Sequence, residues 1–237
     1  MPSLFDIGKS GLQAYRQSLA VTGQNIANIN TDGYKKRETA LEEVTGAGGG
    51  VTEISDQTGL GVRVEDIKRA FDQFLIDKVR QTQALYQKAD TYLDEVKSLE
   101  NLLLPSDANL SNAIGEFFGS LQQIAAAPDD QAPRIISIEK GKDLAGQFNL
   151  YSDRIDNLKE KIFDKANNAV TSVNLLSNQI STINAKLLSS GSGNSSNALL
   201  DQRDLLIDQL SEVCQISVRY INKGAAQVRL GNTGSGP

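Results

Sequence analysis

The fold class of this chain is indicated by residues 144–187, LAGQFNLYSDRIDNLKEKIFDKANNAVTSVNLLSNQISTINAKL. Apolar or small residues recur here at alternating steps of four and three, first up to Ile162 and again from Ala166 onward. A period of about 3.5 residues is typical of helices that pack along one another as in a coiled coil. The stretch predicts one long helix from Pro133 to about residue 188. The extra step of four at Ala166 predicts a local unwinding of that packing.

Four other segments have helical spacing of apolar residues, at 10–29, 69–104, 106–127 and 198–213. Together with the long helix they predict a mainly α fold, a coiled-coil or bundle rod of long helices. Apolar residues make up 39% of the chain and aromatic residues 5%. This content suits helices that bury a stripe of side chains rather than a full globular core.

Two polar regions interrupt the helical pattern. Residues 31–67 contain the glycine run TGAGGG at 45–50 and the alternating stretch TGLGVRVEDI at 58–67. They predict a loop with one short strand. The segment SSGSGNSSN at 189–197 predicts a flexible linker.

The C-terminal part of the sequence predicts a small β region. QISVRYI at 215–221 and AQVRL at 226–230 flank the turn residues Asn222, Lys223 and Gly224, a pattern typical of a β-hairpin. Because a two-stranded hairpin is marginally stable alone, we expect it to belong to a larger sheet.

The sequence offers few groups that could act as catalysts. It has no histidine, so the commonest general base and metal ligand is absent. The single cysteine, Cys214, lies in an apolar run and is predicted to be a buried small residue. Asp129 and Asp130 are interpreted as charges at a helix N-terminus. Asp201, Arg203 and Asp204 are interpreted as a helix-surface or inter-helix ion network. We expect no enzymatic activity, no cofactor and no metal site.

Charge and hydropathy argue against two classes of binding partner, nucleic acids and membranes. The net charge is −5 with a pI near 4.9, and no long basic run is present, which argues against nucleic-acid binding. No stretch approaches 18 apolar residues, and the N-terminus lacks the apolar region of a secretory signal. We therefore expect no membrane partner and no cleaved signal peptide.

The most distinctive polar cluster is QNIANINTDGY at residues 24–34, at the end of the first helical segment. Thr31, Asp32 and Gly33 supply a helix stop and a turn. The preceding helix carries a heptad stripe with one polar member, and such a short helix needs a partner to cover it. The stripe consists of Leu12, Tyr15, Leu19, Thr22, Ile26 and Ile29.

These residues resemble the shared N-terminal segment of bacterial flagellar axial proteins, the subunits of rod, hook and hook–filament junction. The family motif has a Gly-Leu start and the ending Asn-Ile-Ala-Asn-x-x-Thr-x-Gly-Tyr. Asp32 stands where many members have proline, and both residues suit a turn. The matching residues here are Asn25, Ile26, Ala27, Asn28, Thr31, Gly33 and Tyr34.

The block at 59–80 resembles the segment that follows the loop in the axial proteins. The blocks at 112–134 and 197–213 are similar to segments of the hook-associated family that forms the hook–filament junction. The resemblance implies a structural subunit that self-assembles through helices into a tube. It implies export to the cell exterior through the flagellar type III channel. The implied partners are other copies of the chain, the hook protein, the next junction protein, the export apparatus and a chaperone.

The resemblance also implies a domain order and two sets of site residues. We expect an inner-tube helix and turn at 1–34, a loop and β linker at 35–68, a helical rod domain at 69–213, and the start of a truncated outer β domain at 214–237. Inner-tube packing is expected of Leu12, Tyr15, Leu19, Ile26 and Ile29. The junction turn is expected to consist of Asn25, Ala27, Asn28, Thr31, Gly33 and Tyr34.

Three alternatives remain at this stage. The chain could be another flagellar axial protein, of the hook or distal rod, although the blocks at 112–134 and 197–213 argue against this. It could be a soluble coiled-coil binding module of a type III secretion system, with an ordered N-terminal helix in the monomer. An enzyme such as a peptidoglycan hydrolase is the third alternative, and no residue cluster supports it.

Overall fold

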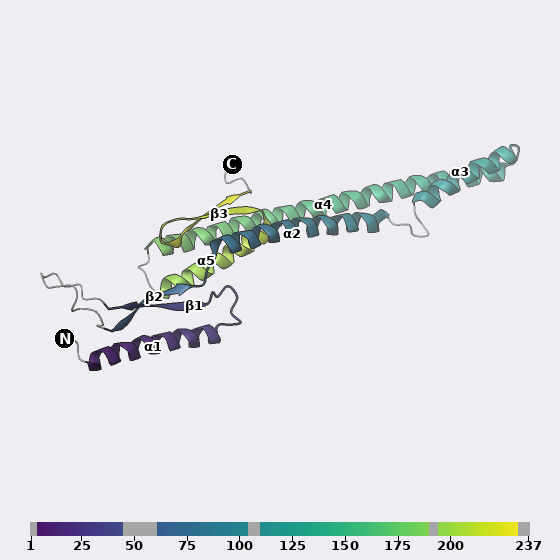
Figure 1. The fold of residues 1–237 in the computed structure, drawn as a ribbon. Helices are drawn as coiled ribbons and strands as arrows, with labels where there is room; N and C mark the ends of the chain where they lie inside the picture. The colour runs from purple at the N-terminus through teal and green to yellow at the C-terminus, as the bar shows by residue number, and fades with distance from the viewer. Residues whose placement is uncertain (1–3, 45–60, 104–109, 190–193, 232–237) are drawn as a thin grey trace. The chain divides into compact units, whose positions relative to one another are not determined.

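The structure, a computed structural model, describes residues 4–44, 61–103, 110–189 and 194–231 (Figure 1). It confirms a mainly helical fold with one very long helix and a small β region near the C-terminal end. The elements are α1 (Leu4–Ala27), β1 (Arg37–Glu43), β2 (Val62–Arg69), α2 (Gln73–Leu103), α3 (Leu110–Ala126), α4 (Gln131–Ser189), α5 (Asn194–Val213), β3 (Ile216–Tyr220) and β4 (Ala226–Leu230).

The chain divides into two compact units. The first contains residues 1–85 and 173–237, and the second contains residues 86–172. Helices α2 and α4 each contribute one part to each unit. The domain order expected from the sequence stays a prediction.

The predicted long helix is α4, with 59 residues. It begins at Gln131, where the Oδ1 atom of Asp130 accepts a hydrogen bond of 2.9 Å from the backbone N–H of Ala132. Asp130 therefore caps the helix, and Pro133 lies in the first turn, where its missing N–H costs nothing. The interpretation of Asp130 as a helix-start residue is confirmed.

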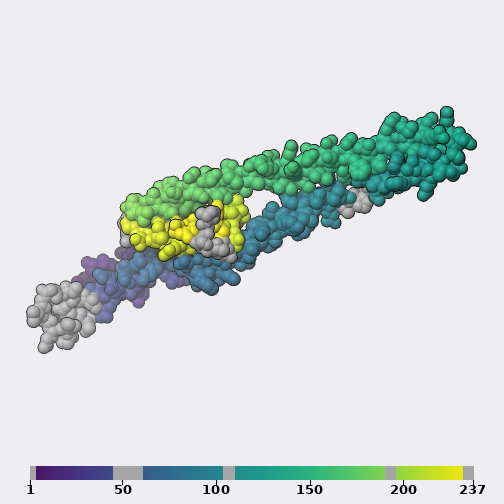
Figure 2. Space-filling model, turned by 90° about the horizontal axis from the view of Figure 1, so that it is seen from above, coloured from purple at the N-terminus to yellow at the C-terminus, as the bar shows by residue number. Residues whose placement is uncertain are grey.

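The core of the first unit lies between the C-terminal part of α4, helix α5 and the β3–β4 hairpin. Figure 2 shows the yellow C-terminal segment packed against the green part of α4. The buried stripe of α4 continues the predicted heptad positions through Ile180, Ile183 and Leu187. A cluster of buried residues joins the elements, and its members are Ile180, Ile207, Leu210, Ile216 and Ala226.

The β3–β4 hairpin is stabilised by helices. Within the described residues its sheet has two antiparallel strands, so the expected larger sheet is not seen there. The side chain of Asn184 in α4 donates to the carbonyl of Ala226 at 2.8 Å and accepts from its N–H at 2.9 Å. Packing against helices provides the apolar surface that an isolated hairpin lacks.

The turn between β3 and β4 depends on Gly224, and replacing it by alanine should destabilise the chain. Gly224 has φ +76°, and a Cβ atom there would lie 2.6 Å from Cδ2 of Leu200. We expect Gly224→Ala to lower the free energy of unfolding by about 1–3 kcal/mol, measured by urea titration. Gly231→Ala is the matched control, because Gly231 has φ +87° but open space around its Cα. An equal loss in both variants would show that the contact with Leu200 contributes nothing.

Cys214 is half-buried rather than fully buried, and it packs against the core of the first unit. Burial raises the pKa of its thiol. Because the thiolate is the nucleophile, iodoacetamide should react more slowly with the folded chain at pH 8.5 than with the chain in urea. The pH at which the folded chain reaches half its maximal alkylation rate should also be higher. Equal rate profiles in the two states would contradict the burial of this thiol.

In the second unit, α3 packs antiparallel to the beginning of α4. Lys140 donates to Glu116 at 2.6 Å, and Gly141 leaves room for the ring of Phe117, which a Cβ atom would meet at 3.3 Å. Further along α4, Lys165 forms an ion pair with Glu95 of α2. The heptad stripes of α2 and α4 are only partly covered here, since Leu93, Phe148, Ile155 and Ile162 remain 42–51% exposed.

Two regions differ from the sequence predictions. The predicted strand at 58–67 is β2, but it pairs antiparallel with β1, a strand that the sequence did not predict. Charged residues in RETALEE conceal the strand pattern of β1. Helix α5 begins at Asn194, inside the segment predicted as a linker, because serine and asparagine also favour helix N-termini.

Candidate assembly site

One face of helix α1 packs against the β1–β2 hairpin (Figure 1). Ser10 Oγ accepts from the N–H of Val62 at 3.2 Å, and Ser18 Oγ lies 2.8 Å from Oγ1 of Thr39. Ala14, between these two serines, and Val21, one turn beyond Ser18, are buried. Residues 10, 14, 18, 21 and 25 therefore form the face of α1 that contacts the hairpin.

A second face of α1 carries the predicted inner-tube residues, and it is exposed. Leu12, Tyr15, Leu19, Ile26 and Ile29 have exposed fractions of 64–79%. At about 100° per residue, this stripe lies roughly 120° around the helix from the hairpin face. Leu4 and Phe5 extend the stripe and are also strongly exposed. The sequence pattern predicts a helix start at residue 10, so these two residues were not among the expected members of the stripe.

The junction turn is organised around the side chain of Asn25. Its Nδ2 group donates to the carbonyl of Arg37 at 2.9 Å, and its Oδ1 atom accepts from the N–H of Arg37 at 2.9 Å. The hydroxyl of Tyr34 donates to the same Oδ1 atom at 2.8 Å. One carboxamide thus ties the end of α1 to the beginning of β1, with Tyr34 as its third partner.

The other predicted turn residues have smaller roles in this arrangement. Asn28 donates to the carbonyl of Gln24 at 2.9 Å and accepts from Thr31 Oγ1 at 3.2 Å. Gly33 has φ +78°, and a Cβ atom there would lie 3.0 Å from Cβ of Leu205 in α5. Ala27 is the exposed last residue of α1 and makes no side-chain hydrogen bond.

Two of the predicted inner-tube residues, Ile26 and Ile29, meet residues of the junction turn at one groove beside α1 and the start of β1, with a volume of about 720 Å³. Its apolar lining includes Val21, Ile26 and Ile29, and its polar lining includes Asn25, Asn28 and Tyr34. The structure therefore brings together residues from both predicted sets on one open surface.

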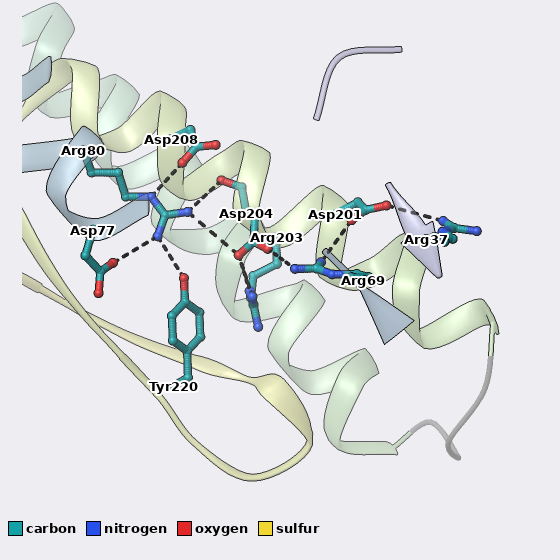
Figure 3. Close-up of polar contacts among 9 residues, drawn as sticks. All are labelled: Arg37, Arg69, Asp77, Arg80, Asp201, Arg203, Asp204, Asp208 and Tyr220. Carbon is teal, nitrogen blue, oxygen red and sulfur yellow. Dashed lines mark hydrogen bonds and ion pairs between the residues drawn. The ribbon is translucent and has the colours of Figure 1, made fainter. Parts of the chain in front are cut away.

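A network of charged residues lies beside the junction turn, and only part of it was predicted from the sequence (Figure 3). Arg37 Nη2 lies 3.4 Å from Asp201 Oδ2, and Arg69 Nη1 lies 3.1 Å from Asp201 Oδ1. Arg69 Nη2 also lies 2.5 Å from Asp204 Oδ2, whose side chain is fully buried. These ion pairs join the two strands of the β1–β2 hairpin to α5.

The network continues from α5 to α2 and β3. Arg80 in α2 donates to Asp208 at 2.6 Å and to the hydroxyl of Tyr220 at 2.9 Å. Arg203 donates to Asp204 at 2.5 Å and lies over the ring of Tyr220, with its Cζ atom 4.6 Å from the ring centroid. Burial raises the pKa of Tyr220, against the opposing effect of Arg80.

Asp201, Arg203 and Asp204 were predicted to form a helix-surface or inter-helix ion network. The structure contradicts the helix-surface alternative, because all three are buried and Asp201 and Asp204 pair with residues of other elements. Arg37, Arg69 and Arg80 were missed, since their partners are more than 120 residues away in the sequence. The one available signal was Arg203, a charged residue on the apolar stripe of α5.

Burial raises the pKa of Asp201 above its ordinary value, while Arg69 and Arg37 act in the opposite direction. The ionised carboxylate is therefore less well stabilised in the folded chain than in water. Four buried polar atoms of the described residues make no hydrogen bond: Arg37 Nε, Arg69 Nη1, Asp201 Oδ1 and Arg203 Nη1. Two of them, Arg69 Nη1 and Asp201 Oδ1, nevertheless face each other as an ion pair at 3.1 Å.

Within the described ranges, no group of three or more histidine, cysteine, aspartate or glutamate side chains is arranged to hold a metal ion. The helices that the structure describes include none with the length and apolar character needed to cross a bilayer. The candidate site consists of the exposed face of α1, the groove and the junction turn.

Comparison with known proteins identifies the family of this chain. The family model of the flagellar hook-associated protein FlgK helical domain matches residues 96–236. The chain belongs to this family. A second model, of the flagella basal body rod proteins, matches residues 5–35, which contain α1 and the junction turn.

Individual relatives of this FlgK-family chain agree with both matches. Flagellar hook-associated protein 1 of Salmonella typhimurium is 29% identical over 98% of this chain and 42% of its own length. The protein of the same name from Bacillus subtilis is 29% identical over 92% of this chain and 44% of its own length. The chain therefore spans less than half the length of these curated relatives.

A solved structure supports the fold of this FlgK-family chain. The flagellar hook junction protein FlgK from Burkholderia pseudomallei superposes with a TM-score of 0.60 and 28% identity. The similarity covers 65% of this chain and 27% of that protein.

Proposed function

We propose that this chain belongs to a structural subunit of the junction between the flagellar hook and the filament. The observation that carries the proposal is the exposed apolar face of α1, in a chain of the FlgK family. An apolar stripe of this length on a soluble helix marks a surface that another protein covers. In the proposed assembly, Leu12, Tyr15, Leu19, Ile26 and Ile29 pack against helices of the inner tube.

The junction turn has a complementary role in this proposal. Asn25, Ala27, Asn28, Thr31, Gly33 and Tyr34 form the connection between the inner tube and the outer parts of the subunit. The hydrogen bonds of Asn25 to Arg37 and Tyr34 support this role, because they fix the direction in which the chain leaves α1. The groove beside Ile26 and Tyr34 provides a place for a neighbouring helix.

The proposed partners are other copies of the subunit, the hook protein and the next junction protein. Such contacts repeat around an axis, so each copy uses two different surfaces. The proposed route to the cell exterior is the flagellar type III channel, with an export chaperone and without a cleaved signal peptide. The subunit acts as a building block and has no catalytic activity in this proposal.

The test is deletion of the gene for the full-length protein, followed by electron microscopy. We expect cells with hooks but without attached filaments, and restoration of filaments by the unmodified gene. An epitope tag on the restored protein should be found at the hook tip. Absence of the hook itself would identify a hook or distal rod protein instead. Normal filaments together with protein retained in the cell would favour a soluble secretion binding module.

A further inference from the structure

The sequence contains one Asp-Gly dipeptide, Asp32–Gly33, and no Asn-Gly dipeptide. It lies in the junction turn, where many flagellar axial proteins have proline before the glycine. An aspartate carboxyl is open to attack by the backbone nitrogen of the next residue, and a glycine in that place has no Cβ atom to hinder the approach. Because the proline side chain has no carboxyl group, the aspartate gives this turn a chemistry that the usual residue lacks.

The turn itself requires glycine at position 33. Gly33 has φ +78°, in the left-handed region that favours glycine, and a Cβ atom there would lie 3.0 Å from Cβ of Leu205. A chain that keeps this turn therefore keeps its glycine. The residue at position 32 then decides whether the dipeptide can react.

Both reacting groups are available in the structure. Asp32 is exposed, and among the described residues its carboxylate has no hydrogen-bond or ion-pair partner. The N–H of Gly33 likewise donates to no described residue, since the hydrogen bond of the turn runs from the N–H of Tyr34 to the carbonyl of Thr31 at 3.2 Å. A looser turn would leave both groups at least as accessible, so their availability does not depend on how firmly the turn is folded before assembly.

Aspartates inside helices differ in this respect. Asp153 of α4 is also exposed, but the N–H of the residue after it lies inside the helix and donates along it. That residue is Arg154, whose side chain crowds the backbone nitrogen. Asp153 therefore provides an internal reference for the reactivity of Asp32.

We propose that Asp32–Gly33 is a site of spontaneous isoaspartate formation. The backbone nitrogen of Gly33 attacks Cγ of the neutral Asp32 carboxyl, and the new C–N bond closes a succinimide ring. The C–OH bond breaks, and the hydroxyl leaves as water with the proton of the N–H. A second water then opens the ring: cleavage at Cγ restores aspartate, and cleavage at the backbone carbonyl gives isoaspartate, whose peptide link runs through Cγ. One water leaves and one enters, so the reaction needs no enzyme and no other reactant.

Isoaspartate alters the turn in two ways. It adds one carbon atom to the backbone between residues 32 and 33, and it moves the free carboxylate onto the main chain. The hydrogen bond from Tyr34 to Thr31 then no longer closes a turn of the same size. The Tyr34 hydroxyl is displaced from Oδ1 of Asn25, which lies 2.8 Å away in the unmodified chain. In the proposed assembly role the chain would leave α1 in a different direction, but the reaction itself does not depend on that role.

Incubation of the 237-residue chain at neutral pH in water enriched in heavy oxygen tests the proposal. Each ring opening incorporates one heavy oxygen atom, so mass spectrometry of peptides digested with trypsin in ordinary water records the reaction. We expect label and isoaspartate at Asp32, in the peptide of residues 17–35, both increasing with the time of incubation. Asp153, in the peptide of residues 143–154, should gain neither.

Two variants separate this reaction from background labelling. Asp32→Glu keeps the negative charge, but its ring would have one more member and close far more slowly, so label at position 32 should fall to the level of Asp153. Asp32→Asn should react several-fold faster, with release of ammonia, because its amide is uncharged at neutral pH. If Asp32 of the unmodified chain gains no more label than Asp153, the proposal is wrong. Equal labelling of Asp32→Glu would also overturn it, because the heavy oxygen would then enter by another route.

Discussion

Replacing Asp204 by alanine should lower the free energy of unfolding by about 3–5 kcal/mol, the largest stability effect expected of any single change in this chain. The Asp204 carboxylate is fully buried and lies within ion-pair distance of Arg69, Arg203 and Arg80. Removing it leaves cationic groups in a site that water does not reach. Such groups lose the pairing that compensates for their desolvation. Urea titration followed by circular dichroism measures the change.

Glu116→Ala provides the comparison for this measurement. Glu116 also forms an ion pair, with Lys140, but its side chain is 58% exposed. Removing an exposed pair should cost at most about 1 kcal/mol. A loss below about 1 kcal/mol in Asp204→Ala as well would mean that the arginines find other partners or water when Asp204 is absent.

The second large effect concerns assembly. Leu19→Asp in the full-length protein should abolish its incorporation into flagella while leaving the fold of the chain unchanged. Leu19 is 73% exposed, so a carboxylate there remains hydrated in the monomer. In an assembled tube the same carboxylate would be buried among apolar side chains without a partner, which is strongly unfavourable. Circular dichroism and thermal melting measure the fold, and electron microscopy of complemented cells measures incorporation.

Gln13→Asp is the matched control, because it introduces the same charge into α1 on a face away from both the apolar stripe and the hairpin. At about 100° per residue, position 13 lies roughly 120° around the helix from the stripe. This variant should assemble normally. If Leu19→Asp instead lowers the melting temperature strongly, Leu19 belongs to a contact within the monomer. If both variants fail to assemble, assembly does not tolerate an added charge on either face of α1, and the apolar stripe has no special role.

The helices were predictable because their evidence is local in sequence. A period near 3.5 residues marks one side of a helix wherever its neighbours lie, so α4 and the positions of Ile180, Ile183 and Leu187 follow from spacing alone. The same spacing cannot say how completely a stripe is covered. Phe148 and Ile155 occupy equivalent positions in α4 yet remain about half exposed. Burial depends on how many elements surround each part of the helix.

The ion network was not predictable in the same way. Arg37, Arg69 and Arg80 are separated from their partners on α5 by most of the chain, and each resembles an ordinary surface arginine in sequence. What brings them to Asp201 and Asp204 is tertiary structure, in particular the pairing of β1 with β2. Since β1 has three glutamates in seven residues, its strand pattern is weak. Missing that strand meant missing the place where Arg37 lies.

The asparagine bonds at the two edges of the β1–β2 hairpin bear on aggregation. A two-stranded sheet presents unpaired N–H and C=O groups along both outer edges, and such edges can recruit strands from other molecules. The carbonyl of Lys36 accepts from Ala70, so the N–H and C=O groups of the next residue, Arg37, point to the outer edge of β1. The carboxamide of Asn25 forms hydrogen bonds with both of these groups. On the opposite edge, Asn197 occupies the carbonyl of Ile67. At these positions side-chain amides take the place of a third strand, which reduces the tendency of the hairpin to form intermolecular β-sheet where many copies are crowded together.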